Sequence, residues 1–110
     1  MGIFIVKKEK DGHFYATLKV KGGRVMLNGT KHLSKSSCKD GIEIIRVNAA
    51  DNLKYEYKKT FDGKFYFRLK SVLGEVLGNS KIYETAENRN VGIETVRRIA
   101  PFASVIDLAS

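Results

Sequence analysis

Two stretches of alternating apolar and polar residues flank an Asp-Gly pair near the N-terminus, and the same arrangement recurs in the second half of the chain. The pairs are Asp11-Gly12 and Asp62-Gly63. Asp and Gly both tolerate the positive φ angles that a tight turn between antiparallel strands requires. Each pair is therefore predicted to join two strands of a β-hairpin.

A second turn follows each hairpin. It falls at Gly22-Gly23 in the first half and at Leu73-Gly74 in the second, and short apolar runs near 25–27 and 76–78 come next. Glycine marks such turns because it adopts backbone conformations that other residues resist. Each half is thus predicted to begin with three antiparallel strands.

A helix is predicted after the third strand of each half. Ser34 and Thr85 stand where a side-chain oxygen would cap the first free N–H groups. Apolar residues then recur at the 3.6-residue period of one buried helix face, and Pro101 ends the second helix. Gly41 and Gly92 interrupt the helices at a cost of about 1 kcal/mol each, which indicates a close approach to a neighbouring element. The apolar stripes are Cys38, Ile42, Ile45 and Ala49, and Ile93, Val96 and Ala100.

The two halves of the chain are related by a shift of 51 residues without gaps. The run 11–19 aligns with 62–70, and Gly41-Ile42-Glu43 aligns with Gly92-Ile93-Glu94. So many matches in one register indicate a duplication, so we predict a single domain of two repeats, about 1–52 and 53–110. Further identical partners are found for Gly23, Val25, Asn28, Arg46 and Ala49.

The opening strand of the repeat occurs three times. Phe4 and Val6 align with Tyr55 and Tyr57, and a further shift of 51 reaches the segment near 104–108. One repeat is too small to bury enough apolar surface alone. We therefore predict an α+β fold in which two β-β-β-α units and a C-terminal strand form one shared antiparallel sheet. Both helices are expected on one face, with pseudo-twofold symmetry.

The marker segments of the second half resemble those of the YegP-like family of small bacterial tandem-repeat proteins. The resemblance rests on the strand 63–70 followed by the helical segment Gly92-Ile93-Glu94-Thr95-Val96-Arg97, and it covers nearly the whole chain. The first copy departs from the pattern at 15–17 and 44–45. The resemblance implies two units that share a sheet and exchange C-terminal strands. It implies no catalytic or binding residues.

Strand alternation predicts a candidate binding face on the sheet. In the second strand of each repeat, Phe, Ala and Leu side chains face the core and a Tyr with basic residues faces outward. Tyrosine and basic side chains can stack bases and hold phosphates, but tyrosine is also a good strand former and lysine a good solubiliser. Ile3, Ile5, Met26 and Leu77 are expected on the same face and favour an apolar contact instead. The candidate residues are Tyr15, Lys19, Tyr66, Arg68 and Lys70.

Charge and cysteine content narrow the function classes. The 20 Lys and Arg against 12 Asp and Glu give a formal charge of +8, which suits an acidic partner or simply favours solubility. Cys38 is the single cysteine, and the N-terminal apolar run is too short for a signal peptide, so a cytoplasmic protein without a membrane contact is expected. Tandem duplication favours a monomer over a dimer.

Residues that carry chemistry are sparse. His13 and His32 align with Lys64 and Tyr83, so neither imidazole is duplicated, and no ligand-spaced cluster suggests a metal or cofactor. Asp11 and Asp62 are expected to serve their turns, and Cys38 is expected to be buried and inert. We therefore predict no enzyme and no catalytic residues. The favoured function is a protein-binding or self-associating module, and the alternative is a nucleic-acid-binding module.

Overall fold

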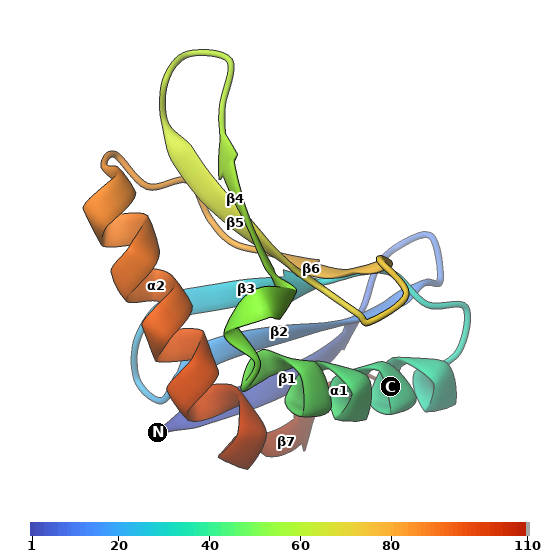
Figure 1. Cartoon of the computed structure of the whole chain (residues 1–110). Coiled ribbons are helices and arrows are strands. Elements are labelled where there is room, and N and C mark those ends of the chain that lie inside the picture. The colour runs from blue at the N-terminus through green and yellow to red at the C-terminus, as the bar shows by residue number, and fades with distance from the viewer. Residues whose placement is uncertain (110) are drawn as a thin grey trace.

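The computed structural model describes residues 1–109 and contains seven strands and two α-helices (Figure 1). Short 3-10 turns follow each helix, η1 at Asn52–Lys54 and η2 at Ala100–Phe102. The fold is therefore mixed α+β, as predicted. The main elements are β1 (Gly2–Lys8), β2 (Phe14–Val20), β3 (Val25–Gly29), α1 (Lys35–Ala49), β4 (Tyr55–Lys59), β5 (Phe65–Lys70), β6 (Val76–Asn79), α2 (Ala86–Ile99) and β7 (Ser104–Asp107).

All seven strands form one sheet in the order β4-β5-β6-β3-β2-β1-β7. The prediction of a wholly antiparallel sheet is wrong, because β7 runs parallel to β1. The place beside β2 is taken by β1, and β7 lies at the outer edge of β1. The first and second halves meet in the middle of the sheet, where Asn28 pairs with Asn79.

Strand registers in the two halves correspond at a spacing of 51 residues. Phe4 pairs with Leu18 in β1–β2, and Tyr55 pairs with Leu69 in β4–β5. The third strands follow the same rule, since both β2–β3 and β5–β6 contain a register shift, after Leu18 and after Leu69. Every strand of the first half thus has a counterpart in the second, and β7 adds a seventh strand at the outer edge of β1.

Helix α1 begins at the predicted cap, where the Ser34 side chain accepts a hydrogen bond from the backbone N–H of Ser37. Thr85 caps α2 in the same way. Helix α1 contacts β1, β2, β5 and β6, and α2 contacts β3 and β5. Figure 1 shows both helices in front of the sheet. Across residues 1–109, no helix has the length and apolar character needed to cross a bilayer.

The core lies between the helices and the sheet. Phe4, Leu18, Phe67 and Leu69 are each at most 1% exposed and come from both halves. The predicted helix stripes are buried against these side chains. They are Cys38, Ile42, Ile45 and Ala49 of α1, Ile93 and Val96 of α2, and Ala100 at the start of η2. A single core therefore joins the two halves.

Met26 and Leu77 do not lie on the outward sheet surface, which corrects the prediction made from strict alternation. Met26 is 1% exposed and belongs to the core, and Leu77 packs against the core. Leu18 pairs with Leu27 and Lys19 with Val25, so Met26 is the extra residue of a β-bulge. A bulge interrupts the alternation of side chains, and Leu77 occupies the same position in β6.

Candidate functional site: an open sheet face and a free sheet edge

The five predicted site residues lie on one surface of the sheet, which we call the outer face. Tyr15 and Lys19 flank the buried Ala16 and Leu18 in β2, and Tyr66, Arg68 and Lys70 alternate with the buried Phe67 and Leu69 in β5. All five side chains are half-buried. Two strands separate the pair on β2 from the three on β5, about 14 Å at ordinary strand spacing. The structure therefore forms two clusters rather than one.

A continuous row of paired residues crosses the outer face from one edge of the sheet to the other. Its centre is the Asn28–Asn79 pair, its β4–β5 end is polar, and its β1–β7 end is apolar. Thr17 in this row is 3% exposed, so the first half lacks the solvent-facing polar group that Arg68 provides in the second. The row is Glu56, Arg68, Asn79, Asn28, Thr17, Ile5 and Ile106.

Arg68 is held in place by its neighbours on this face. Its Nε donates to Asn79 Oδ1 at 3.0 Å, and its guanidinium lies 5.8 Å from the centre of the Tyr66 ring. Glu56 lies within 3.9 Å of Arg68 and 3.6 Å of Lys70. Exposed ion pairs of this kind contribute little stability, roughly 0–1 kcal/mol. Their consequence here is that Glu56 offsets part of the positive charge of the outer face.

Sequence reasoning overlooked several members of the outer face. Lys7 pairs with Tyr15, and Lys58 pairs with Tyr66, so each tyrosine has a lysine beside it on the neighbouring strand. The 51-residue shift relates Lys7 to Lys58 and would have found this pair. Glu56 could also have been found, because alternation along 53–58 places it outward with Lys58.

The outer edge of β4 is the end of the sheet, and within residues 1–109 no strand pairs with it. The backbone N–H of Thr60 bonds to the carbonyl of Lys64 in the adjoining turn. Since backbone groups alternate in direction along a strand, Glu56 and Lys58 direct theirs toward β5. Tyr55, Tyr57 and Lys59 consequently direct their backbone N–H and C=O groups toward the free edge.

The corresponding edge of β1 is covered by β7. Ile5 pairs with Ile106, and the N–H of Leu108 donates to the carbonyl of Val6 at 2.9 Å. Asp107 lies 3.2 Å from both Lys35 and Lys39 at the start of α1. The covered edge thus combines a parallel backbone ladder with an acidic side chain held by two lysines.

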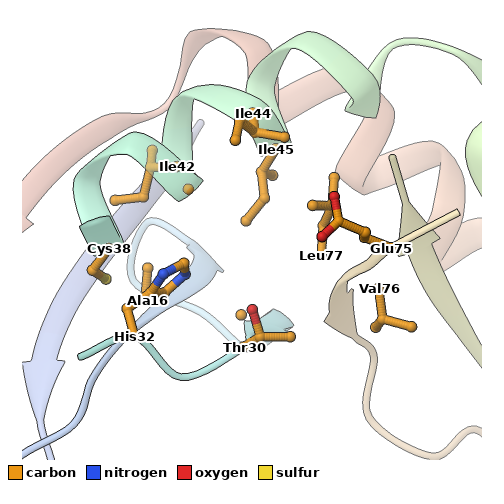
Figure 2. A pocket seen from close by; sticks show the side chains of 12 residues that line it. Ala16, Thr30, His32, Cys38, Ile42, Ile44, Ile45, Glu75, Val76 and Leu77 are labelled. Carbon is orange, nitrogen blue, oxygen red and sulfur yellow. The ribbon is translucent and has the colours of Figure 1, made fainter. Parts of the chain in front are cut away.

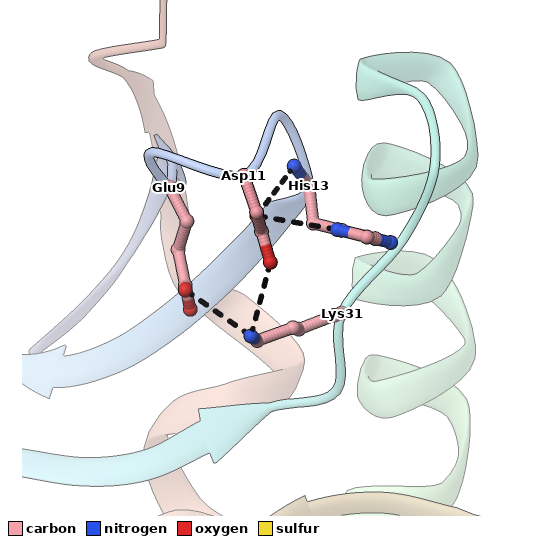
Figure 3. Close-up of polar contacts among 4 residues, drawn as sticks. All are labelled: Glu9, Asp11, His13 and Lys31. Carbon is pink, nitrogen blue, oxygen red and sulfur yellow. Dashed lines mark hydrogen bonds and ion pairs between the residues drawn. The ribbon is translucent and has the colours of Figure 1, made fainter.

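A polar cluster links the β1–β2 turn to the segment before α1 (Figure 3). Lys31 Nζ lies 3.2 Å from Glu9 and 3.5 Å from Asp11, while Asp11 Oδ1 accepts the backbone N–H of His13 at 3.0 Å. The His13 backbone N–H is the largest influence holding the pKa of Asp11 below its ordinary value. This supports the structural role predicted for Asp11, since its carboxylate closes its own turn.

A cavity of about 170 Å³ lies between α1 and β6 (Figure 2). Its lining is mainly apolar and includes Leu77, with Cys38, Glu75 and His32 as its ionisable members. His32 Nδ1 lies 2.9 Å from Ser37 Oγ. Burial raises the pKa of the Cys38 thiol, which keeps it protonated and agrees with the predicted inert role.

The described side chains also bear on the question of a metal site. Within residues 1–109, no three His, Cys, Asp or Glu side chains are placed to hold a metal ion. The outer face and the free β4 edge offer instead hydrogen-bonding groups, aromatic rings and positive charge. Such groups are suited to binding.

Comparisons with known proteins agree with this architecture. The family model described as Domain of unknown function (DUF1508) matches twice, at 9–56 and 62–107. A UPF0339 protein of Pseudomonas aeruginosa is 36% identical over 94% of each chain, and UPF0339 protein YegP of Escherichia coli is 36% identical over 87% of each.

Two solved structures share the fold. The solution NMR structure of YegP from Escherichia coli has a TM-score of 0.92 at 34% identity, covering 99% of this chain and 94% of its own. That of a UPF0339 protein from Shewanella oneidensis has a TM-score of 0.91 at 27% identity, covering 98% and 92%. The resemblance inferred from the marker segments is confirmed, and the chain belongs to the DUF1508 family, whose domains are of unknown function.

Proposed function

We propose that the protein is a non-catalytic binding module that takes an extended segment of a partner protein along the free edge of β4. In this proposal the two halves are tandem copies whose helices cover the same face of the shared sheet. The observation that carries it is the contrast between the two equivalent edges. The edge of β1 holds β7 in parallel, whereas the edge of β4 holds no strand of residues 1–109.

Addition of a strand to an exposed sheet edge is a common mode of peptide recognition. Main-chain hydrogen bonds supply much of the affinity, and alternate side chains supply the specificity. The β1–β7 pair indicates how such a segment would lie, because Val6 at the covered edge corresponds to Tyr57 at the free edge. A partner strand parallel to β4 would reach the backbone groups of Tyr55, Tyr57 and Lys59.

The charge around the free edge favours an acidic partner. Lys58 and Lys59 end the strand, and Arg89 of α2 lies 5.0 Å from the centre of the Tyr57 ring. Lysines on an edge strand also discourage pairing with uncharged strands. The net charge of +8 attracts acidic segments over longer distances. Asp107 held by Lys35 and Lys39 at the covered edge is an internal example of the same chemistry.

Selection from a library of random ten-residue peptides tests this function. Enriched peptides are expected to be acidic and to form strands. Their affinities would be measured by fluorescence anisotropy on the parent protein, on Tyr57→Pro and on Tyr57→Ala. Both variants lose the ring, but only proline removes the N–H that points to the free edge. Binding should survive in Tyr57→Ala and fall at least tenfold in Tyr57→Pro, as expected for lost backbone hydrogen bonds.

Equal binding by the two variants, or the absence of any enriched peptide, would reject strand addition at β4. Circular dichroism of Tyr57→Pro would show that the sheet remains folded. A second copy of the chain is the competing occupant of the edge. Sedimentation equilibrium distinguishes it, because a self-associating edge would give dimers of the parent protein and monomers of Tyr57→Pro.

A second candidate function is nucleic-acid binding by the outer face. The observation in its favour is that each tyrosine of the outer face has a cation beside it, Lys7 next to Tyr15 and Lys58 next to Tyr66. Aromatic rings stack bases and cations hold the phosphates of single strands. Glu56 weakens this candidate, because it pairs with two of the five predicted site residues.

Fluorescence anisotropy with single-stranded RNA and DNA tests this candidate. Contacts to about four phosphates predict a log–log salt slope of about −3. Tyr66→Ala with Arg68→Ala should weaken binding, while Glu56→Gln, which removes the opposing charge, should strengthen it. Absence of binding at low salt would eliminate nucleic acid as a ligand of this face.

A further inference from the structure

A second cavity lies between α2 and the start of β3, in the position that the 51-residue shift relates to the cavity of Figure 2. Its volume is about 290 Å³. This is the space of roughly ten water molecules in the liquid, so a small organic ion fits in it. Each cavity is bordered by the helix of one half and the third strand of the other. The lining residues are Arg24, Met26, Lys81, Tyr83, Asn88, Val91, Gly92 and Thr95.

The Tyr83 hydroxyl is a buried polar group in this lining without a hydrogen-bond partner in residues 1–109. Tyr83 is 8% exposed, and its ring is stacked on Phe67 with centroids 6.4 Å apart. An unsatisfied buried hydroxyl is costly, and native proteins keep few of them. Gly92 faces the hydroxyl, because a Cβ at that position would collide with it. The absence of a side chain there makes room for the hydroxyl at the wall of the cavity.

Two cations border the same space. Lys81 Nζ lies 5.1 Å from the centre of the Tyr83 ring. Arg24 is near enough to oppose, by its charge, the rise that burial causes in the pKa of Tyr83. Neither cation forms an ion pair within the described chain, and no acidic side chain of residues 1–109 contributes to the lining. The cavity therefore combines a hydroxyl donor with uncompensated positive charge.

The equivalent cavity in the other half has the opposite character. Glu75 stands there in place of Arg24, and Thr30 stands in place of Lys81. His32 replaces Tyr83, and its Nδ1 already has Ser37 Oγ as a partner at 2.9 Å. The shape recurs in both halves, whereas the positive charge and the free donor occur at α2 alone.

We infer that the cavity at α2 is a binding site for a small phosphate-bearing anion. Arg24 and Lys81 contact the phosphate oxygens, and the Tyr83 hydroxyl donates a hydrogen bond to one of them. Arginine suits this task because its planar guanidinium donates two parallel hydrogen bonds to a phosphate. The remaining volume beside Asn88 and Thr95 accommodates the organic part of a phosphate monoester. This site is independent of the β4 edge and of the outer face.

NMR titration of the isotope-labelled full chain tests the site. The probes are inorganic phosphate and glycerol phosphate, each compared with sodium chloride at the same ionic strength. Saturable shifts are expected for the amides of Tyr83, Gly92 and Thr95 with both phosphate probes. Shifts that chloride reproduces, or that do not saturate, would overturn the inference.

Variants separate the site from general electrostatics. The double variant Arg24→Ala/Lys81→Ala should raise the dissociation constant at least tenfold, because two charge-assisted contacts are lost. The control Lys8→Ala/Lys10→Ala removes the same charge from two exposed lysines at the β1–β2 turn and should change the dissociation constant less than threefold. Equal effects of the two double variants would contradict the inference.

Tyr83→Phe tests the hydroxyl alone. It should weaken phosphate binding severalfold, yet the melting temperature without phosphate should not fall, because no internal hydrogen bond is lost. Unchanged phosphate affinity in Tyr83→Phe would remove the hydroxyl from the site and contradict the proposed contact.

Discussion

Replacing Gly92 by alanine gives a sharp test of the packing between α2 and the sheet. A Cβ at this position would lie 2.8 Å from Tyr83 Cζ and 3.3 Å from Phe67 Cε2, and closer still to the Tyr83 hydroxyl. The Tyr83 ring cannot turn away freely, since it is 8% exposed and stacked on Phe67. The added methyl group must therefore displace either the ring or the helix.

Two opposing effects determine how much Gly92→Ala changes the free energy of unfolding. Alanine in a helix interior is favoured over glycine by about 1 kcal/mol. Overpacking against a buried side chain costs about 1–3 kcal/mol, and the direct collision with a stacked ring places this site at the upper end. Gly92→Ala should therefore destabilise the protein by about 2 kcal/mol, which corresponds to a fall in melting temperature of roughly 8 °C.

Urea denaturation followed by circular dichroism measures the effect, and two variants control it. Gly41→Ala is the matched position in α1, where the new Cβ would meet His32 Nε2 at 2.9 Å. His32 is half-buried and can move, so this change should stay within about 1 kcal/mol of the parent protein. In a Tyr83→Leu background, Gly92→Ala should no longer destabilise. A neutral or stabilising Gly92→Ala in the parent protein would show that the Tyr83 ring does not block a side chain at position 92.

Three further predictions concern single side chains. Tyr55→Phe should lower the free energy of unfolding, measured by urea denaturation, by about 1–2 kcal/mol. The reason is that the buried Tyr55 hydroxyl donates a hydrogen bond to the Ala49 carbonyl at the end of α1, at 2.7 Å. An unchanged free energy of unfolding would show that water can replace this bond. Cys38 should resist a thiol reagent in the native protein and react in denaturant, because it is 1% exposed and burial raises its pKa; rapid native labelling would contradict its buried position. Desolvation tends to raise the pKa of Asp107, but hydrogen bonds from Lys35 and Lys39 outweigh it and hold the pKa below its ordinary value. The folded form is thus favoured above the ordinary pKa of about 4, and this advantage is lost as pH falls through the lowered value. The protection factors of the β7 amides, which correct for the intrinsic pH dependence of exchange, should fall in acid in the parent protein and stay constant there in Asp107→Asn, and identical profiles of the protection factors would exclude the Asp107 contacts as the cause.

Local features of the fold could be predicted from the sequence because they depend on neighbouring residues. Gly12 and Gly63 have φ angles of 89° and 88°, as the Asp-Gly turns require. Ser34 and Thr85 cap their helices because each supplies a side-chain oxygen at the first turn. Mid-helix glycine indicated a close approach, and the structure identifies the neighbour of Gly92 as the Tyr83 ring.

Features that depend on pairing between distant segments could not be predicted in this way. The bulges that turn Met26 and Leu77 toward the core arise from the register between strands, which a single strand does not contain. The place and the parallel direction of β7 depend on its pairing with β1, which is about 100 residues away in the sequence. The candidate site residues were placed on one face by alternation alone, but their division into two clusters depends on the strand order.

The two equivalent sheet edges differ in one respect. Strand β7 covers the edge of β1, whereas no strand of residues 1–109 covers the edge of β4. Amide hydrogen exchange of Val6 and Tyr57 tests this difference most directly, because the two residues occupy the same position in β1 and β4. We expect a slowly exchanging Val6 N–H beneath β7 and a rapidly exchanging Tyr57 N–H that slows when an acidic strand-forming peptide is added. Equally slow exchange of both amides in the isolated protein would contradict this expectation.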